Sequence, residues 1–252
     1  MVDTVLKDFL QRIPLDYREL LSDFLSSNDH LQHLANLAQS ENEARTLYPG
    51  QIFPEQADVF KALTETPVDA VKVILLGQDP YHSPGLAQGL AFSIPEQIPI
   101  TSKAYPSSLR NMSKALFLDG FNTLAHGNLQ DWAKQGVLLL NTSLTVAMGV
   151  PQSHQAWGWQ VLTDAIIQSL SKKQAMVWLL WGKVAQKKAS LICSDHAHLI
   201  LTASHPSGLG AYQTNTPFLY RGDTKACGHF RKTNDWLTQQ SKSPIVWSSN
   251  LF

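Results

Sequence analysis

The sequence predicts an α/β protein with a central, mostly parallel four-stranded sheet flanked by helices. Four short, nearly continuous apolar runs are typical of strands buried on both faces of a parallel sheet. Segments with helical periodicity separate these runs, and this alternation is typical of α/β domains. A chain of 252 residues, of which 44% are hydrophobic and 16% charged, can bury one sizeable core. We therefore expect residues 1–252 to form a single domain.

The elements are predicted in the following order. Residues 1–60 have the pattern of acidic amphipathic helices, for example DYRELLSDFLSS (16–27), and form the N-terminal part of the domain. The Pro and Gly residues of YPGQIFPE (48–55) predict a loop. The predicted strands are 70–76, 137–140, 175–180 and 199–202, and the predicted helices between and after them are 108–118, 155–170 and 183–192.

The charge of the chain is balanced overall but uneven along its length. Residues 1–70 carry 5 Lys/Arg and 12 Asp/Glu, a net −7, whereas residues 71–252 carry 15 and 8, a net +7. Residues 165–194 contain five lysines and no acidic residue, and residues 97–118 contain Lys103, Arg110 and Lys114 and again no acidic residue. A locally positive surface of this kind suits a phosphate backbone. The alternative is an ordinary mixture of solvated surface charges.

The cysteines and the N-terminus indicate a cytoplasmic protein. Only Cys193 and Cys227 occur, so a disulfide framework is not expected. The first residues lack the basic start and apolar block of a secretory signal, and no apolar stretch is long enough for a membrane span. The two cysteines and scattered histidines do not have zinc-ligand spacing, so we expect no metal and no cofactor.

Polar residues follow each of the four predicted strands. GQDPYH (77–82), Asn141, WGK (181–183) and SHPS (204–207) stand at these positions. The carboxyl ends of parallel strands meet at one edge of a sheet, where ligands bind in open α/β folds. Asp79 is a candidate general base there, and Pro80 stiffens its loop. The alternative for Asp79 is the cap of a turn or helix.

Four motifs resemble those of the family 1 uracil-DNA glycosylases. They are GQDPYHSPGLAQGLAFSI (77–94), GNLQDWAKQGVLLLNTSLTV (127–146), VWLLWGKVAQKK (177–188) and SHPSGLGA (204–211). The similarity extends from about Tyr48 to SPIVW (243–247). It implies a monofunctional glycosylase that flips uracil out of DNA and hydrolyses its N-glycosidic bond, the first step of base excision repair. It also implies single- or double-stranded DNA as substrate and a DNA-mimicking protein as inhibitor. One compact domain suggests a monomer.

The resemblance implies a role for each matched residue in the reaction. Asp79 would position and activate the attacking water, and His205, as a neutral imidazole, would donate a hydrogen bond to uracil O2. The Asn141 amide matches the O4 and N3–H edge of uracil and mismatches cytosine. The remaining base contacts would be the backbone amide of Gln78 to a uracil carbonyl, Tyr81 as a steric wall against the methyl group of thymine, and Phe92 stacked on the base. For Phe92, Asn141 and His205 the alternatives are core packing, a strand-end turn and a structural histidine.

Further matches imply contacts with DNA. Leu209 would enter the duplex in place of the extruded nucleotide, and Ser108 and Ser207 would hold flanking phosphates. His154 matches a position near the DNA groove. Outside a motif, the leucine would be ordinary packing and the serines helix or turn caps.

The chain departs from the family pattern in two loops. Ser107 replaces a proline in the loop 106–109, and Gly208 and Gly210 replace a proline and a serine in the loop 205–210. Glycine raises the entropic cost of ordering a loop, so we expect weaker DNA binding or a more mobile leucine loop. Residues 212–226 form a longer segment than the family pattern predicts. Three other functions stay open: a glycosylase with altered base choice, a DNA-binding module without turnover, and a hydrolase of free nucleosides.

Overall fold

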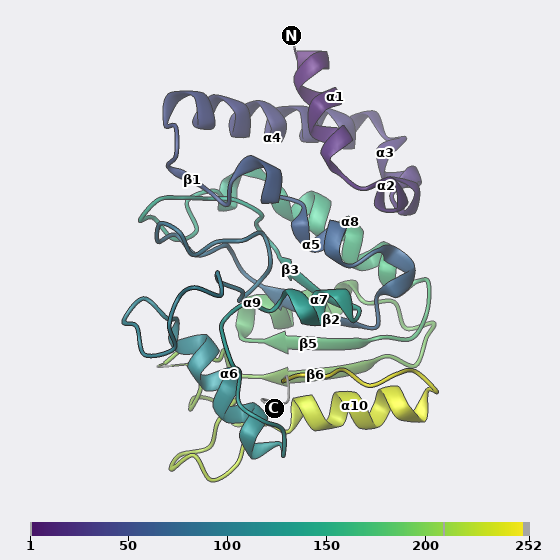
Figure 1. The fold of residues 1–252 in the computed structure, drawn as a ribbon. Coiled ribbons are helices and arrows are strands. Elements are labelled where there is room, and N and C mark those ends of the chain that lie inside the picture. The colour runs from purple at the N-terminus through teal and green to yellow at the C-terminus, as the bar shows by residue number, and fades with distance from the viewer. Residues whose placement is uncertain (1, 209, 249–252) are drawn as a thin grey trace.

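The protein is built on a four-stranded parallel sheet in the order β3-β2-β5-β6, which confirms the predicted fold class. The computed structural model describes residues 2–208 and 210–248. Figure 1 shows the sheet between the N-terminal helices and the last helix, with its strand arrows pointing the same way. The strands are β2 (Val73–Gly77), β3 (Val137–Asn141), β5 (Val177–Trp181) and β6 (Leu199–Ala203).

The three strands β2, β3 and β5 are buried on both faces, as the apolar runs predict. The same expectation is wrong for β6. Its Ile200 is 42% exposed and Thr202 is also exposed. The reason is position, because β6 is an edge strand whose alternate residues face solvent, whereas the other edge strand, β3, is covered by α5 and α7.

The predicted helices are present, but with different bounds and types. The segment predicted as one helix over 155–170 is a 3-10 turn followed by α8, because Gly158 adopts a left-handed φ of +93° between them. The segment 183–192 is likewise divided between α9 and a 3-10 helix. The α-helices are α1 (Val2–Arg12), α2 (Leu15–Leu20), α3 (Ser22–Leu25), α4 (Asn28–Leu47), α5 (Lys61–Glu65), α6 (Ser107–Leu118), α7 (Gln130–Lys134), α8 (Trp159–Ser171), α9 (Lys183–Gln186) and α10 (His229–Gln239), and the 3-10 helices are η1 (Gln56–Asp58), η2 (Val68–Ala70), η3 (Gln155–Trp157) and η4 (Lys187–Leu191).

The acidic N-terminal part packs onto the sheet domain through aromatic residues. Figure 1 shows α1 to α4 gathered at one end of the molecule. The Phe9 ring lies 5.4 Å from the Phe60 ring and 5.8 Å from the Trp159 ring, between centroids. The carboxylate of Glu41, which is 1% exposed, pairs with Arg12 and Arg45 at 2.6 and 2.9 Å. Residues from Phe9 to Trp247 thus share one hydrophobic core, and we propose that the chain is one domain.

A second, two-stranded sheet was not predicted from the sequence. It pairs β1 (Ile52–Phe53) with β4 (Val146–Ala147) in antiparallel register. Strands of two residues show no hydrophobic periodicity, so the pattern could not reveal them. The pair fixes the loop that follows β4, because the Met148 N–H donates to the Gln51 carbonyl at 2.7 Å. Within the described residues, no helix is both long and apolar enough to cross a membrane.

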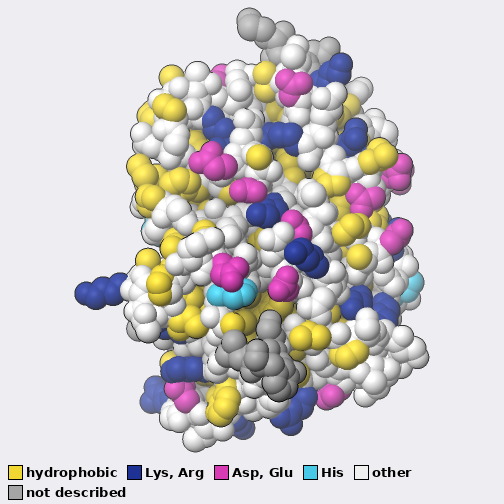
Figure 2. Space-filling model, in the orientation of Figure 1, with side chains coloured by type: hydrophobic (Ala, Val, Ile, Leu, Met, Phe, Trp, Pro, Cys, Tyr) yellow, Lys and Arg dark blue, Asp and Glu magenta, His cyan; other side chains and the backbone are white. Residues whose placement is uncertain are grey.

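Two of the five lysines in residues 165–194 are paired with acidic side chains in the folded protein. Lys173 pairs with Asp69 at 3.0 Å and Lys188 with Asp164 at 2.6 Å. Lys173 follows the end of α8, which returns to the amino-terminal edge of the sheet, so it lies away from the carboxyl ends of the strands. Over the face seen in Figure 2, basic and acidic side chains are interspersed.

Candidate active site

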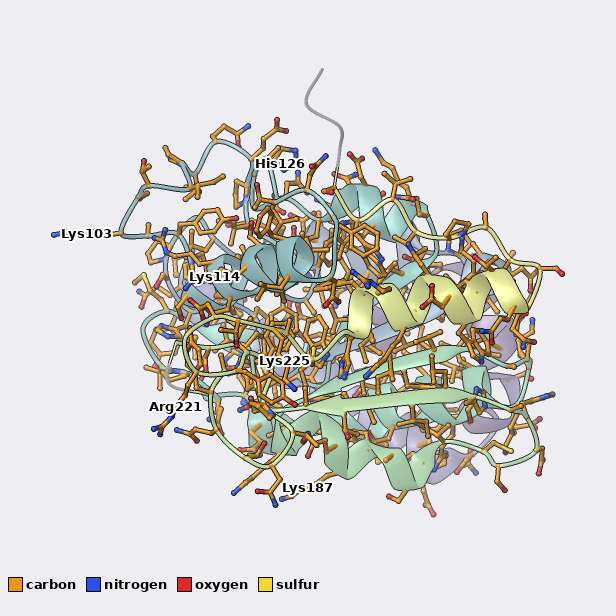
Figure 3. The ribbon with its side chains drawn as sticks, turned by 90° about the horizontal axis from the view of Figure 1, so that it is seen from below. Lys103, Lys114, His126, Lys187, Arg221 and Lys225 are labelled. Carbon is orange, nitrogen blue, oxygen red and sulfur yellow. The ribbon has the colours of Figure 1, made fainter. Side chains whose placement is uncertain are left out.

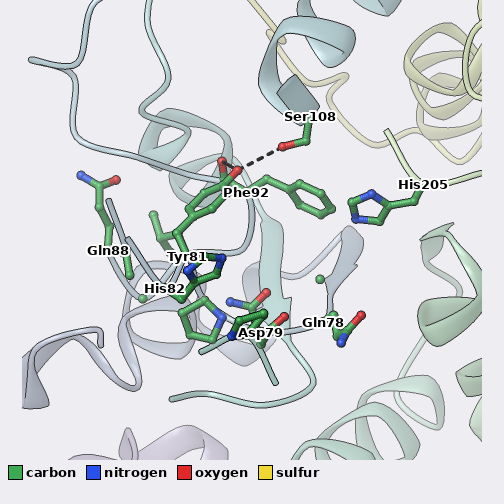
Figure 4. Close-up of a pocket in the computed structure, with 15 residues that line it drawn as sticks. Gln78, Asp79, Tyr81, His82, Gln88, Phe92, Ser108 and His205 are labelled. Carbon is green, nitrogen blue, oxygen red and sulfur yellow. Dashed lines mark hydrogen bonds between the residues drawn. The ribbon is translucent and has the colours of Figure 1, made fainter. Parts of the chain in front are cut away.

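Most of the predicted site residues line one cavity at the carboxyl edge of the sheet. The cavity has a volume of about 210 Å³ and is open to solvent on one side. Asp79 from the loop after β2 and His205 from the loop after β6 both face it, as the strand-end pattern predicts. Figure 4 shows these residues around the cavity, with the Phe92 and His205 rings side by side. The predicted residues that line it are Gln78, Asp79, Tyr81, Phe92, Ser108, Asn141 and His205.

The Asp79 carboxylate is held by the loop that follows β4. Its Oδ2 accepts a hydrogen bond from the Gln152 backbone N–H at 2.8 Å. Gln152 has a left-handed φ of +61°, and the Gly149 N–H of the same loop donates to the His82 carbonyl at 2.9 Å. Burial raises the pKa of Asp79 above its usual value, and the Gln152 N–H partly opposes this by stabilising the carboxylate. The Gln152 N–H therefore orients the carboxylate through its Oδ2.

The His205 imidazole is neutral, and its tautomer is fixed. The Ser207 backbone N–H donates to Nδ1 at 3.1 Å, so Nδ1 is the unprotonated acceptor and the proton lies on Nε2. Burial lowers the pKa of His205 below the usual histidine value, because desolvation disfavours the imidazolium. The cavity thus contains an uncharged N–H donor of defined orientation.

Tyr81 and Phe92 form one wall of the cavity through a shared hydrogen-bond network. The Tyr81 hydroxyl donates to the Phe92 carbonyl at 3.1 Å and lies 3.1 Å from the Ser108 hydroxyl oxygen. Phe92 has a left-handed φ of +67°, a conformation that costs a non-glycine residue about 1–3 kcal/mol. Its ring lies 5.7 Å from the His205 ring and 5.9 Å from the Trp181 ring. Burial raises the pKa of Tyr81, so the phenol stays protonated.

Asn141 stands at the end of β3, directly beside the end of β2. It is 7% exposed and pairs in register with Gly77. A Cβ at position 77 would lie only 2.1 Å from the Asn141 Oδ1. The absence of a side chain at Gly77 therefore lets the Asn141 amide occupy its place at the cavity wall.

The loop after His205 contains the departures from the family motif. The Gly208 N–H donates to the Ser107 hydroxyl oxygen at 3.0 Å, so the two departures contact each other. Ser207 is partly buried behind His205 and does not line the cavity. Leu209 lies outside the described residues, and the predicted insertion into DNA is not tested.

The structure does not bring His154 to the cavity. Its side chain is 3% exposed, stacks on Trp157 at 3.4 Å between ring centroids, and has its Nδ1 2.8 Å from the Thr145 hydroxyl oxygen. Burial lowers the pKa of His154 to about 4. Contact with DNA through this side chain stays a prediction, and its burial disfavours it.

The sequence did not single out several residues that shape the site. His82, Gln88 and Pro151 also line the cavity. His82 and Gln88 belong to the motif 77–94, and this position is the one signal that could have drawn attention to them. Gln152 acts through its backbone, so no side-chain pattern could reveal it. Within residues 2–208 and 210–248, no group of three or more His, Cys, Asp or Glu side chains is placed to hold a metal ion.

Comparisons with known proteins agree on one family. The model of the uracil DNA glycosylase superfamily matches residues 64–238. A uracil-DNA glycosylase of Idiomarina loihiensis is 49% identical over 78% of this chain and 85% of its own length. One of Proteus mirabilis is 41% identical over 93% and 96%. A crystal structure of mimivirus uracil-DNA glycosylase superposes with a TM-score of 0.74 at 25% identity, over 97% of this chain and 93% of that one. A mimivirus UNG variant in complex with UGI has a TM-score of 0.76 at 26% identity, over 91% and 88%.

Proposed function

Because the chain belongs to the uracil DNA glycosylase superfamily, we propose that it removes uracil from DNA by hydrolysing the N-glycosidic bond. The product is DNA with an abasic site, and the reaction is the first step of base excision repair. One observation carries the assignment of the site: a carboxylate and a neutral imidazole from separate strand ends face the same small cavity. A base extruded from the DNA stack would occupy this cavity.

Base choice depends on the cavity wall. The Asn141 amide reads the O4 and N3–H edge of uracil, and Phe92 stacks on the base. Tyr81 stands where the methyl group of thymine would have to lie, and its two hydrogen bonds keep the phenol in place. The Gln78 backbone amide holds a uracil carbonyl. The carbonyl of Gln78 supports this position, because it accepts hydrogen bonds from the Thr142 hydroxyl and the Ser143 N–H, both at 2.9 Å.

The chemical step is a hydrolysis with dissociative character. The C1′–N1 bond breaks, and its electron pair leaves with uracil, on which negative charge develops at O2. The Nε2–H of His205 donates to this oxygen, and it acts mainly in the transition state because the charge develops there. A water oxygen bonds to C1′, and Asp79 accepts its proton. No matched catalytic position is a lysine that could form a Schiff base, so strand cleavage is not part of the reaction.

The DNA backbone crosses the open side of the cavity. Ser207 contacts a flanking phosphate and Leu209 replaces the extruded nucleotide, in line with the family motif. The Ser108 side chain is 6% exposed, and its hydroxyl is hydrogen-bonded to the Tyr81 hydroxyl. To contact a phosphate, the Ser108 hydroxyl must exchange this hydrogen bond for one to the phosphate. The DNA-facing surface also suits a protein inhibitor that mimics DNA, and the complex of the mimivirus relative with UGI supports this. A monomer in the cytoplasm fits the shared core and two free cysteines.

An oligonucleotide assay tests the function and its alternatives. Single-stranded oligonucleotides containing one U, T or C, and free deoxyuridine, are incubated with the protein and base release is measured. We expect release of uracil from the U-containing oligonucleotide, and no base release from the T or C oligonucleotide or from free deoxyuridine. Release of thymine or cytosine would favour altered base choice, binding without release would favour a DNA-binding module, and release from deoxyuridine alone would favour a nucleoside hydrolase.

A further inference from the structure

The segment that follows the His205 loop forms a hairpin, which we define as residues 218–227. The Cys227 N–H donates to the Phe218 carbonyl and the Tyr220 N–H to the Lys225 carbonyl, both at 3.0 Å. The Asp223 N–H closes the turn onto the Tyr220 carbonyl at 3.0 Å, and Gly222 has the left-handed φ of +80° that the third residue of a type II turn requires. This geometry places Arg221 at the exposed second position of the turn.

The base of hairpin 218–227 is fixed to the residue before His205. The Ser204 hydroxyl oxygen accepts the Phe218 N–H at 2.9 Å, and the Ser204 N–H donates to the Thr216 carbonyl at 2.9 Å. The side chains of Phe218 and Leu219 are fully buried. The hairpin therefore has a fixed position relative to the catalytic cavity.

The tip of the hairpin is held by an ion pair that neutralises its acidic residue. Asp223 accepts hydrogen bonds from the Lys114 ammonium of α6 and from the Tyr212 hydroxyl, both at 2.8 Å. These hydrogen bonds lower the pKa of Asp223, so it stays ionised and paired. Arg221 and Lys225 are exposed, and neither has an acidic partner in the described part of the chain. The Lys225 ammonium lies 4.1 Å from the centre of the Tyr220 ring, which orients it.

We propose that hairpin 218–227 is a second DNA-contacting element, which binds backbone phosphates of the duplex beside the extruded nucleotide through Arg221 and Lys225. Figure 3 shows both side chains at the end of the molecule to which the strand arrows point, where Lys103, Lys114 and Lys187 also lie. Two cations on a backbone that is already ordered bind phosphate with little further loss of entropy. The inference rests on the proposed function, because it requires that DNA occupies the open side of the cavity.

Salt-dependent binding tests the proposal. All variants are made in an Asp79→Asn background, so that a uracil-containing duplex binds while loss of its uracil is slowed. Arg221→Ala/Lys225→Ala should make the slope of log affinity against log salt shallower by about 0.9 for each lost phosphate contact. Lys7→Ala/Lys172→Ala is the matched control: it removes the same charge from two exposed lysines, on α1 and just after α8, that have no acidic partner among the described side chains. This control should keep the original slope.

A charge-preserving variant and a short substrate separate the possible causes. Arg221→Lys/Lys225→Arg should keep the slope of the parent protein, because phosphate contacts need only the positive charges. An unchanged slope in the alanine variant, or an equal loss in the charge-preserving one, would overturn the proposal. With Asp79 intact, the alanine variant should release uracil from a single-stranded tetranucleotide at close to the parental rate, because so short a strand has few phosphates beyond the extruded nucleotide and no duplex. If the parent protein itself releases no uracil, the proposed function fails instead.

Discussion

Substitution of Gly77 by alanine should weaken base recognition although it replaces neither Asp79 nor His205. Gly77 is the last residue of β2 and lies in register with Asn141. An added Cβ would meet the Asn141 Oδ1 at 2.1 Å and the Ala91 Cβ at 3.0 Å. Real contacts of a Cβ are essentially never shorter than 3.0 Å, so the Asn141 amide must retreat by at least 0.9 Å, the difference between 3.0 and 2.1 Å.

The expected loss follows from this displacement. A misplacement of about 1 Å can reduce turnover about 100-fold, which corresponds to about 2.7 kcal/mol of transition-state stabilisation. We therefore expect Gly77→Ala to slow uracil release by about this factor in single-turnover assays on a single-stranded uracil oligonucleotide. Thermal unfolding of the variant provides the control, because a protein that folds normally but releases uracil slowly has lost recognition and not structure.

A double-mutant cycle identifies the group through which Gly77→Ala acts. In an Asn141→Ala background the clashing Oδ1 is absent, and only the looser approach to Ala91 remains. The Gly77→Ala substitution should then cost little, because both changes remove the same interaction. If Gly77→Ala slows the reaction as much in that background as in the parent, its effect does not pass through Asn141 and the reasoning is refuted.

Four further predictions concern Asp79, His205 and the base-reading amide of Asn141. Asp79→Asn should cut turnover while uracil binding stays largely intact, and single-turnover rates compared with inhibition by free uracil would show this; an equal loss of both would contradict it. Turnover should fall at acidic pH because Asp79, whose pKa is raised by burial, then binds a proton. Turnover should not fall as pH rises from about 6 to about 8, across the usual histidine pKa of about 6.5, because His205 acts in its neutral form. Burial lowers the pKa of His205 in the folded protein relative to the unfolded chain. The contribution of neutral His205 to the free energy of unfolding is therefore full above the unfolded-state pKa and is lost as pH falls toward the folded-state pKa. A comparison of acid unfolding between the parent protein and His205→Gln measures this contribution. Asn141→Asp should admit cytosine, and undetectable release of cytosine would count against the proposed reading of the base edge.

The sheet could be predicted from the sequence because its strands are buried by their neighbours. An apolar run such as VLLL (137–140) has no polar position, and only a strand or helix covered on all sides tolerates this. The same pattern over-predicts burial at β6, since hydrophobicity does not reveal which strand lies at an edge. The bounds of α8 also could not be predicted, because the left-handed Gly158 interrupts a segment whose periodicity continues through it.

The site was predictable to the extent that it depends on strand ends. Asp79, Asn141 and His205 each follow a predicted strand, and parallel strands bring their carboxyl ends together. Phe92 belongs to no strand, so only the motif GLAFS pointed to it. The Gln152 N–H that orients Asp79 belongs to a loop that β1 and β4 hold in place, and neither of these two-residue strands can be recognised in the sequence.

The loop departures contact each other, which their single positions in the sequence do not reveal. Taken one at a time, Ser107, Gly208 and Gly210 each indicate a loss of rigidity. In the folded protein the Gly208 N–H, which a proline would lack, donates to the Ser107 hydroxyl, which a proline would also lack. The two replacements therefore supply the donor and the acceptor of one bond between the loops. At Gly210, a Cβ would lie 2.8 Å from the His205 carbonyl oxygen, so a serine there would disturb the backbone of His205. Restoring one family residue at a time would thus remove the contact between the loops or displace His205. The effect of the family residues on DNA binding can therefore be measured only in a variant in which both loops are changed together.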